Sequence, residues 1–461
     1  MNRSWLRKLT VFVLSSAALG ACSSNGSTSG QGSSGSSSAG VSGAQTSGGG
    51  SVSTGGSSAT AGAGASQLGG AGSGGSLSGA SSGAGGSAGS VATAGGGSSS
   101  AGSPNAGGNG GASSRLNPKE FVKAMAPGWN LGNTFDAEPN ETSWGNPETT
   151  QAMIQAVHAA GFNTIRIPVT WTNHIGPAPT YTVDPTWMAK VVEVAAWANE
   201  AGLYFIINTH HDTDAGGFIL FDVNGNPISQ AQQTQLTTEV GLLWTQIATT
   251  FNSYGDHLIF ECFNEPGGNN QYGGGDAFGQ GLLNKYLASC MSAIRATGGN
   301  NATRYVMVQG EGASAIQSSI QAVVIPNNDP NVLFSVHDYF PYQFCGGGGA
   351  TNWGSGSDYS QMAGAVKAIP TWLPAGMGIV LGEWGSVQGD DINSRVAHAT
   401  AWAHDTAVAG IAPVVWDDGG NYDLLNRSSN PPSWKYQTIV NGIMAGHTAG
   451  LAPGATYATG P

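Results

Sequence analysis

The sequence predicts an α/β fold, a (β/α)8 TIM barrel, in the part of the chain from residue 115 onward. Eight apolar, strand-like stretches recur between residues 128 and 416, separated by segments long enough for a helix. Alternating strand and helix implies parallel strands, and eight such units in a domain of this size point to a closed barrel. Polar residues also mark nearly every strand end, whereas an open doubly wound sheet, the alternative, concentrates them near one switch point.

The expected strands are short apolar runs. They are 128–132, 164–170, 204–210, 258–265, 304–309, 332–339, 378–383 and 412–416. The expected helices follow the apolar pattern between them. They are 146–160, 185–201, 234–251, 278–296 and 395–409. Gly161, Gly202 and Gly410 follow three of these segments, where a glycine commonly ends a helix.

The first 21 residues have the three parts of a signal peptide: basic residues, an apolar run and small residues. Residues 19–22, Leu-Gly-Ala-Cys, resemble a bacterial lipobox, in which Cys22 becomes the lipidated first residue of the mature protein. An ordinary signal peptide with a cysteine nearby is the alternative. The apolar run is too short to span a membrane, which takes about 20 residues. We therefore expect an exported protein, either extracellular or a lipoprotein of the bacterial cell surface (outer membrane), that meets a membrane only through its lipid anchor.

Residues 23–114 contain no charged residue, no histidine and no aromatic residue, and are nearly all Gly, Ser, Ala and Thr. Such a segment cannot bury enough apolar surface to offset its ordering entropy. We therefore expect a disordered linker that tethers one folded domain, residues 115–461.

The net charge and the number of cysteines argue against two classes of protein, nucleic-acid-binding proteins and disulfide-rich proteins. The chain has 27 acidic residues against 15 basic ones, a net charge of −12, which argues against nucleic acid as a partner and favours an uncharged substrate. Apart from Cys22 there are three cysteines, too few for a disulfide framework. Cys262 is expected to be an inert thiol in a core strand, and the sequence leaves open whether Cys290 and Cys345 pair.

Two carboxylates stand at the ends of buried strands. Glu265 closes the run at 258–265, and Glu383 closes the run at 378–383. A lone buried charge is costly, so carboxylates at strand ends call for partners, and a pair at one mouth suits acid/base and nucleophilic chemistry. Strand alternation places Glu261 on the face of Glu265 but deeper, where we expect a core network residue.

In a barrel, the carboxyl ends of all strands open onto one face, so the polar residues at those ends become neighbours. They are Asn133, Arg166, His210, His211, Asn264, Glu265, His337, Tyr339, Glu383 and Trp416. Adjacent residues of a strand point to opposite faces, so His210 and His211 are not expected to share a metal ion. No metal and no organic cofactor is expected.

Several short motifs together resemble glycoside hydrolase family 5. They are IRIPVTW (165–171), NTHHD (208–212), FNEP (263–266), HDYFP (337–341) and GEWG (382–385). Two further motifs, GWNLGNTFDA (128–137) and WGNP (144–147), resemble its endoglucanase branch. The resemblance covers most of 120–440 and implies that residues 115–461 form a catalytic domain that cleaves a β-1,4-linked glucan with retention of configuration. We expect this protein to be a monomer.

The resemblance also implies roles for single residues. Glu265 matches the general acid/base and Glu383 the nucleophile, with Arg166 expected to pair with Glu383 and Tyr339 to hydrogen-bond it. Asn264 is expected to bind the sugar 2-hydroxyl. His210 and His337 match residues that support the cleavage subsite, and Trp416 is expected to stack on a sugar face. Apart from the resemblance, we expect His211 to join His210 in binding sugar hydroxyl groups. The sequence departs from the commonest family pattern at Asp338 and at residues 309–311, which end in Glu311, a rival carboxylate.

Two other classes remain to be weighed. A serine hydrolase needs a G-x-S-x-G elbow at a strand-to-helix turn, and no strand end supplies one. A non-catalytic carbohydrate-binding surface lipoprotein would keep the aromatic residues but has no need of paired carboxylates. Among β-glycans, the sequence leaves cellulose, xyloglucan, mixed-linkage glucan, mannan and xylan open, because loops set the specificity.

Overall fold

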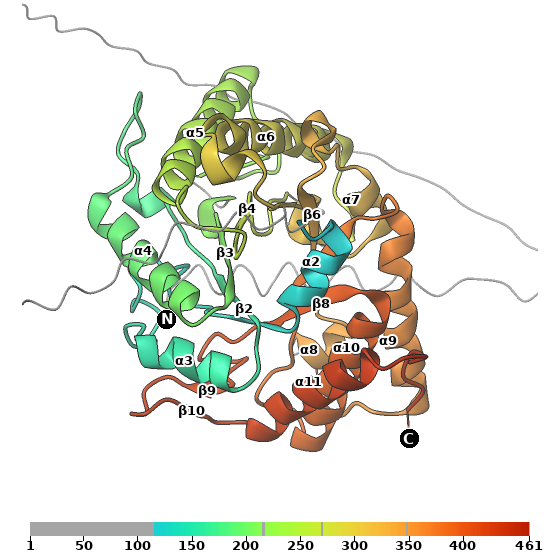
Figure 1. The fold of residues 1–461 in the computed structure, drawn as a ribbon. Helices are drawn as coiled ribbons and strands as arrows, with labels where there is room; N and C mark the ends of the chain where they lie inside the picture. The colour runs from blue at the N-terminus through green and yellow to red at the C-terminus, as the bar shows by residue number, and fades with distance from the viewer. Residues whose placement is uncertain (1–114, 214–216, 269–270, 347–348, 461) are drawn as a thin grey trace, which may run out of the picture. The chain divides into compact units, whose positions relative to one another are not determined.

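A computed structural model describes residues 115–213, 217–268, 271–346 and 349–460. Within them, eight strands in chain order form a closed parallel barrel in which β8 pairs with β1. Helices surround these strands (Figure 1), so the predicted (β/α)8 fold is confirmed. The signal peptide, Cys22 and the linker at 23–114 lie outside the described residues. Among the described residues, no helix is both long enough and apolar enough to cross a bilayer.

Each expected strand is present. The strands are β1 (Gly128–Asn130), β2 (Thr164–Ile167), β3 (Tyr204–Asn208), β4 (Leu258–Glu261), β5 (Val306–Val308), β6 (Val332–His337), β7 (Gly378–Glu383) and β8 (Ile411–Val415). Most end earlier than predicted. Because β4 ends at Glu261, the expectation that Glu261 and Glu265 share a strand face is wrong. Glu265 lies in the loop beyond this strand, four residues after its last residue.

The α-helices match the expected segments and add others. They are α2 (Pro118–Met125), α3 (Gln151–Ala159), α4 (Pro185–Glu200), α5 (Gln230–Thr250), α6 (Ala277–Ala296), α7 (Gln317–Gln321), α8 (Tyr342–Cys345), α9 (Gly356–Ala368), α10 (Ile392–Ala409) and α11 (Gln437–Gly450). The helix expected from residue 146 begins only at Gln151, where the Thr150 side chain caps it. A small hairpin, β9 (Leu425–Asn426) and β10 (Ser433–Trp434), follows β8.

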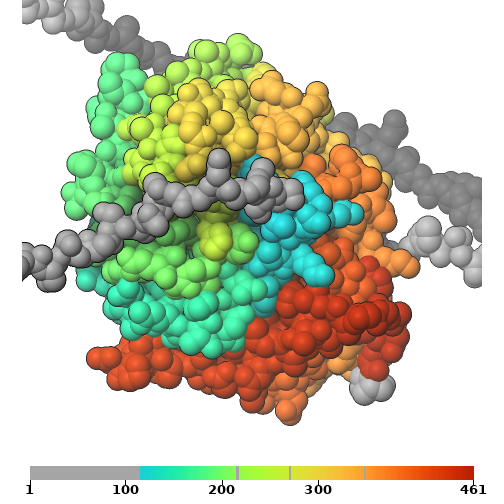
Figure 2. Space-filling view, viewed as in Figure 1, coloured from blue at the N-terminus to red at the C-terminus, as the bar shows by residue number. Residues whose placement is uncertain are grey.

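Helix α2 covers the amino-terminal end of the barrel. Asn117 and Glu120 form a capping box that starts it, with proline at the first position. Phe121, Val122 and Met125 join an apolar cluster of strand residues. These include Ile206, Ile259, Met307, Leu333, Val380 and Val414. Figure 2 shows the blue segment that contains α2 beside the red carboxyl-terminal segment. Because α2 covers this end, the opposite end is the one available for the site.

The cysteine predictions are corrected by the structure. Cys262 and Cys290 form a disulfide that joins the end of β4 to α6, with the two Cα atoms 6.1 Å apart. Cys262 is therefore not an inert thiol, and Cys290 does not pair with Cys345, which is a free, buried thiol 3.1 Å from the His398 Nε2 atom. The disulfide closes the segment that carries Glu265.

Candidate active site

The two predicted carboxylates meet at the carboxyl end of the barrel. The His337 Nδ1 atom lies 2.8 Å from Glu265 Oε1 and 3.8 Å from Glu383 Oε2. One oxygen of Glu265 lies within 4.8 Å of one oxygen of Glu383. Glycosidases that retain configuration hold their carboxyl groups about 5–5.5 Å apart, whereas inverting enzymes need about 6.5–9.5 Å. The oxygen spacing of Glu265 and Glu383 is therefore shorter than the separation that inverting enzymes need.

The buried guanidinium of Arg166 contacts Glu383 and the residue before Glu265. Arg166 donates from Nη1 to Glu383 (2.8 Å), from Nε to Glu261 (2.7 Å) and from Nη2 to Asn264 (2.7 Å). The expected Arg166–Glu383 ion pair is thus present. Glu261 also accepts from Asn208 and Ser335, so it belongs to the core network as expected. One cation therefore serves two buried carboxylates.

The environment of Glu383 combines burial with compensating donors. Burial raises the pKa of its carboxyl, His337 and Arg166 oppose this rise, and Glu265 adds to it, so the net pKa lies above the ordinary value. The Tyr339 hydroxyl donates to Glu383 Oε2 at 3.0 Å, as expected. For His337, burial lowers the pKa, but the charge of Glu383 and the contact with Glu265 raise it more. The His337 imidazole therefore lies between the two carboxylates, and their proximity favours its protonated form.

Sequence reasoning missed Tyr272. Its hydroxyl donates to Glu265 Oε2 at 2.8 Å, from the short 3-10 helix η3 (Gln271–Gly273) in the loop after β4. The family motifs carry no such residue, and a tyrosine in a glycine-rich loop gives no periodic signal. The rival carboxylate Glu311 lies elsewhere, because its Oε2 atom accepts the Asp276 N–H ahead of α6 (2.9 Å).

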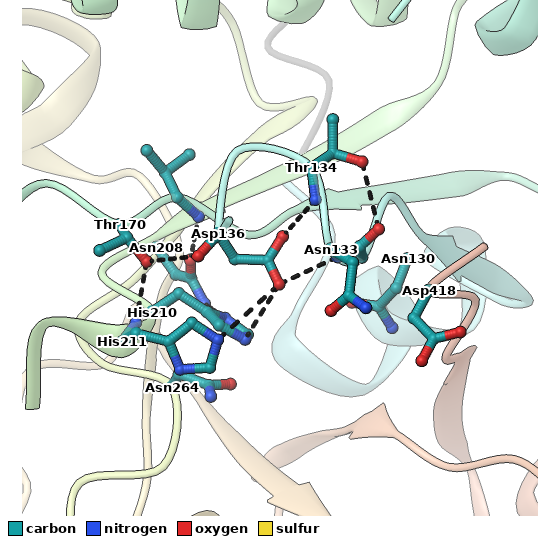
Figure 3. A network of polar contacts seen from close by, with 12 residues as sticks. Asn130, Asn133, Thr134, Asp136, Thr170, Asn208, His210, His211, Asn264 and Asp418 are labelled. Atoms are coloured by element: carbon teal, nitrogen blue, oxygen red, sulfur yellow. Dashed lines mark hydrogen bonds and ion pairs between the residues drawn. The ribbon is translucent and has the colours of Figure 1, made fainter. Parts of the chain in front are cut away.

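Sequence reasoning also missed Asp136, which anchors one side of the site (Figure 3). Its carboxylate accepts the backbone N–H groups of Thr134 (2.7 Å) and Asn133 (3.0 Å). Asn133 adopts a left-handed conformation (φ 52°), which asparagine tolerates. The Nε2 atoms of His210 and His211 both lie 3.9 Å from Asp136 Oδ2. Burial raises the pKa of Asp136 to about 7, and these backbone hydrogen bonds limit the rise.

The expectation that His210 and His211 point apart is therefore wrong. Strand β3 ends at Asn208, and His211 begins the 3-10 helix η2 (His211–Thr213), so strand alternation does not apply to them. The ligand atoms of Asp136, His210 and His211 lie within 4.8 Å of one another, a spacing that raises the question of a metal site.

The tautomer of His210 answers this question. Asn208 accepts the Val169 N–H with its carbonyl oxygen (3.0 Å), so its amide nitrogen is the group that faces His210 Nδ1 (3.2 Å). Nδ1 must accept, which places the imidazole proton on Nε2. A protonated Nε2 donates hydrogen bonds and cannot bind a metal ion. In this tautomer, His210 presents an N–H group beside Asp136.

Two tryptophans flank this histidine pair. Trp416, 8% exposed, lies parallel to the His210 ring with centroids 5.8 Å apart. A Cβ atom at Gly132 would lie 2.6 Å from the Trp416 ring, so the close packing requires glycine there. Trp144, 37% exposed, lies 5.3 Å from the His211 ring. The site thus places two indole rings beside the polar groups of Asp136, His210 and His211.

Comparisons with known proteins agree with this geometry. The family model for cellulase (glycosyl hydrolase family 5) matches residues 130–421. Endoglucanase B of Clostridium cellulovorans is 40% identical over 312 residues, covering 66% of this chain and 69% of the relative. Cellulase/esterase CelE of Acetivibrio thermocellus is 39% identical over 346 residues, covering 72% of this chain and 41% of the relative.

Solved structures give the same result. The chain is 39% identical to ZgEngAGH5_4 in complex with a cellotriose, with a TM-score of 0.67 over 71% of this chain and 98% of that one. A family 5 xyloglucanase from Paenibacillus pabuli is 33% identical, with a TM-score of 0.65 over 71% and 99%. The chain belongs to glycosyl hydrolase family 5, in its endoglucanase branch, and is a glycoside hydrolase.

Proposed function

We propose that the protein is a retaining endo-β-1,4-glucanase that hydrolyses internal bonds of β-glucans by double displacement. The observation that carries this proposal is the spacing of Glu265 and Glu383, within 4.8 Å between one oxygen of each. That spacing leaves no room for a water molecule between the sugar and Glu383, which an inverting reaction requires. Glu383 therefore attacks the sugar itself.

The reaction has two steps. In the first, a Glu383 oxygen bonds to the anomeric carbon, the bond from that carbon to the glycosidic oxygen breaks, and the Glu265 proton passes to the leaving oxygen. In the second, a water oxygen bonds to the same carbon, the ester bond to Glu383 breaks, and the water proton passes to Glu265. Arg166, at 2.8 Å, stabilises the carboxylate of Glu383 before attack and after release.

The surrounding residues hold the sugar. Asn264, fixed by Arg166, is placed to bind the 2-hydroxyl, a contact that strengthens in the transition state. The Nε2–H of His210 and the carboxylate of Asp136 supply a donor and an acceptor 3.9 Å apart, which suits a hydroxyl group that accepts from one and donates to the other. Trp416 offers a ring on which an apolar sugar face stacks.

We take β-1,4-glucan as the first candidate substrate class, supported by relatives that are described as endoglucanases. Xyloglucan is the second candidate, supported by the likeness to a family 5 xyloglucanase. Mixed-linkage glucan, mannan and xylan remain alternative substrates that the same double-displacement mechanism would hydrolyse. A non-catalytic carbohydrate-binding lipoprotein is disfavoured by the paired carboxylates.

We also infer that the protein is exported, with a lipid on Cys22 and residues 23–114 as a tether between membrane and catalytic domain. The basic, apolar and small-residue pattern of residues 1–21 supports this. Mass spectrometry of the amino-terminal peptide from a bacterial host tests it. A lipid on Cys22 that the Cys22→Ser variant loses would support the anchor, whereas an unmodified terminus would refute it.

Reducing-sugar release tests the proposed function. The mature chain is assayed on carboxymethylcellulose, xyloglucan, barley β-glucan, mannan and xylan beside the Glu265→Gln and Glu383→Gln variants. The matched control is Glu239→Gln, on the outer helix α5. We expect hydrolysis of carboxymethylcellulose that the two site variants lose and the control keeps. Activity unaffected by both site variants would refute the mechanism, and inactivity on every polymer would favour a binding protein.

A further inference from the structure

The loop between β4 and α6 places a phenol on the acid/base. The Tyr272 hydroxyl donates to Glu265 Oε2 at 2.8 Å, while His337 Nδ1 lies 2.8 Å from Glu265 Oε1. Both oxygens of the carboxyl group are therefore contacted by protein groups. An ionised carboxylate only accepts hydrogen bonds, so the Tyr272 hydroxyl, which donates to one of its oxygens, matches its ionised form.

The phenol is a donor over the whole working range of pH. Burial raises the pKa of Tyr272, and the charges of Glu265 and Glu383 raise it further, well above its usual value. A neutral phenol beside a carboxylate donates its proton without transferring it. Tyr272 is therefore a permanent hydrogen-bond donor, in contrast to His337, whose charge depends on pH.

The loop that carries Tyr272 is fixed to the barrel at several points. The Cys262–Cys290 disulfide closes it at its base. The Gly312 N–H donates to the Pro266 carbonyl at 2.7 Å, just after Glu265. The Glu311 carboxylate accepts the Asp276 N–H at 2.9 Å. Because covalent and buried polar contacts hold both ends, the position of the phenol is set by the fold.

We propose that Tyr272 is a positioning residue for the acid/base: its hydroxyl stabilises and orients the Glu265 carboxylate that forms when the leaving group departs and that takes the proton from water in the second step. This inference rests on the proposed retaining mechanism. Deglycosylation depends on the carboxylate form of Glu265, so it depends on Tyr272 more than glycosylation does.

The titratable and charged groups around Glu265 come from four parts of the barrel. They are Arg166 on β2, Tyr272 on η3, His337 and Tyr339 at the end of β6, and Glu383 on β7. Arg166 reaches Glu265 only through its neighbours Asn264 and Glu383. Unlike the His337 imidazole, the Tyr272 phenol can be replaced by a phenyl ring without changing the charge of the site.

The Tyr272→Phe variant tests the proposal by its pH profile. Loss of a hydrogen bond to the ionised form shifts a carboxyl pKa upward, here by about one pH unit. We therefore expect the basic limb of kcat/KM on cello-oligosaccharides to move upward by about that amount in Tyr272→Phe. The matched control is Tyr286→Phe, which loses a hydrogen bond from α6 to the Ile219 carbonyl (3.0 Å) and touches no carboxylate. The control keeps the wild-type profile.

A substrate with an activated leaving group separates the two steps. Dinitrophenyl β-cellobioside needs no acid in the first step, so kcat reports deglycosylation. We expect Tyr272→Phe to lower kcat about 10-fold with a parallel fall in KM, because the glycosyl-enzyme accumulates. A purely structural role would instead lower the melting temperature and reduce activity equally at every pH.

The possible results separate a failure of the Tyr272 proposal from a failure of the proposed function. A shifted basic limb with slowed deglycosylation supports the proposal. An active wild-type enzyme whose Tyr272→Phe variant keeps the wild-type limb, or loses activity uniformly over pH, overturns the proposal and leaves the proposed function intact. A wild-type enzyme inactive on every β-glucan and β-cellobioside overturns both.

Discussion

Replacing Arg166 by methionine probes the charge balance of the whole site. Its guanidinium is fully buried and lies 2.7 Å from Glu261 and 2.8 Å from Glu383. Removing one partner of a buried ion pair costs about 3–5 kcal/mol, because an uncompensated charge remains. Two carboxylates lose their cation here, so we expect a loss of about 5 kcal/mol in the free energy of unfolding. At about 2 °C per kcal/mol for a domain of this size, the melting temperature falls by about 10 °C.

The pH dependence of this loss follows from the sign of the pKa change. Burial already raises the folded-state pKa of Glu383, and without Arg166 the cation that opposes this rise is lost, so the folded-state pKa lies further above the unfolded value of about 4.3. A carboxyl whose folded pKa is raised stabilises the fold below its unfolded pKa, and that stability is lost as the pH rises through its folded pKa. The deficit of Arg166→Met relative to wild type is therefore larger at pH 8 than at pH 5.

Urea unfolding of both proteins at pH 5 and pH 8 measures this deficit. The matched control is Arg304→Met, since Arg304 is also buried but donates to the Asn301 side chain and to backbone carbonyls. Its deficit should be the same at both pH values. Wild-type stability of Arg166→Met, or an equal pH dependence in both variants, would refute the reasoning.

Three further predictions concern the nucleophile and the loop. Tyr339→Phe removes a hydrogen bond to charged Glu383, so kcat should fall about 10–100-fold with little change in KM; an unchanged kcat would contradict the contact. Because burial raises the pKa of Glu383 and the ionised form attacks, the acidic limb of kcat/KM should lie above pH 4.3; a limb below pH 4 would contradict this. Replacing Cys262 and Cys290 by alanine opens a loop of 28 residues and should cost about 3–4 kcal/mol in unfolding experiments. The control Cys345→Ala opens no loop, and an equal loss there would contradict the estimate.

The barrel and the carboxylate pair could be predicted from the sequence because each depends on short, contiguous segments of the chain. Apolar runs that alternate with helical segments fix the order of the strands, and polar residues just beyond each run reach the same mouth. Glu265 lies four residues past the last residue of β4, yet it still reaches the site, because the loops that follow the strands lie at that end of the barrel. Arg166 pairs with Glu383 for the same reason.

What sequence reasoning missed depends on contacts between segments far apart in the chain. The Cys262–Cys290 disulfide forms because α6 packs back against the end of β4. Tyr272 reaches Glu265 from a loop that is held by residues after β5. The orientation of His210 depends on where β3 stops, which a run of apolar residues does not show.

The stereochemistry of hydrolysis tests the central claim most directly. Proton NMR of cellotetraose, recorded within the first minutes after adding enzyme, shows which anomer forms before mutarotation. A carboxylate pair with oxygens within 4.8 Å predicts the β-anomer as the first product. An initial α-anomer would show that water attacks directly and would contradict the assignment of Glu383 as nucleophile.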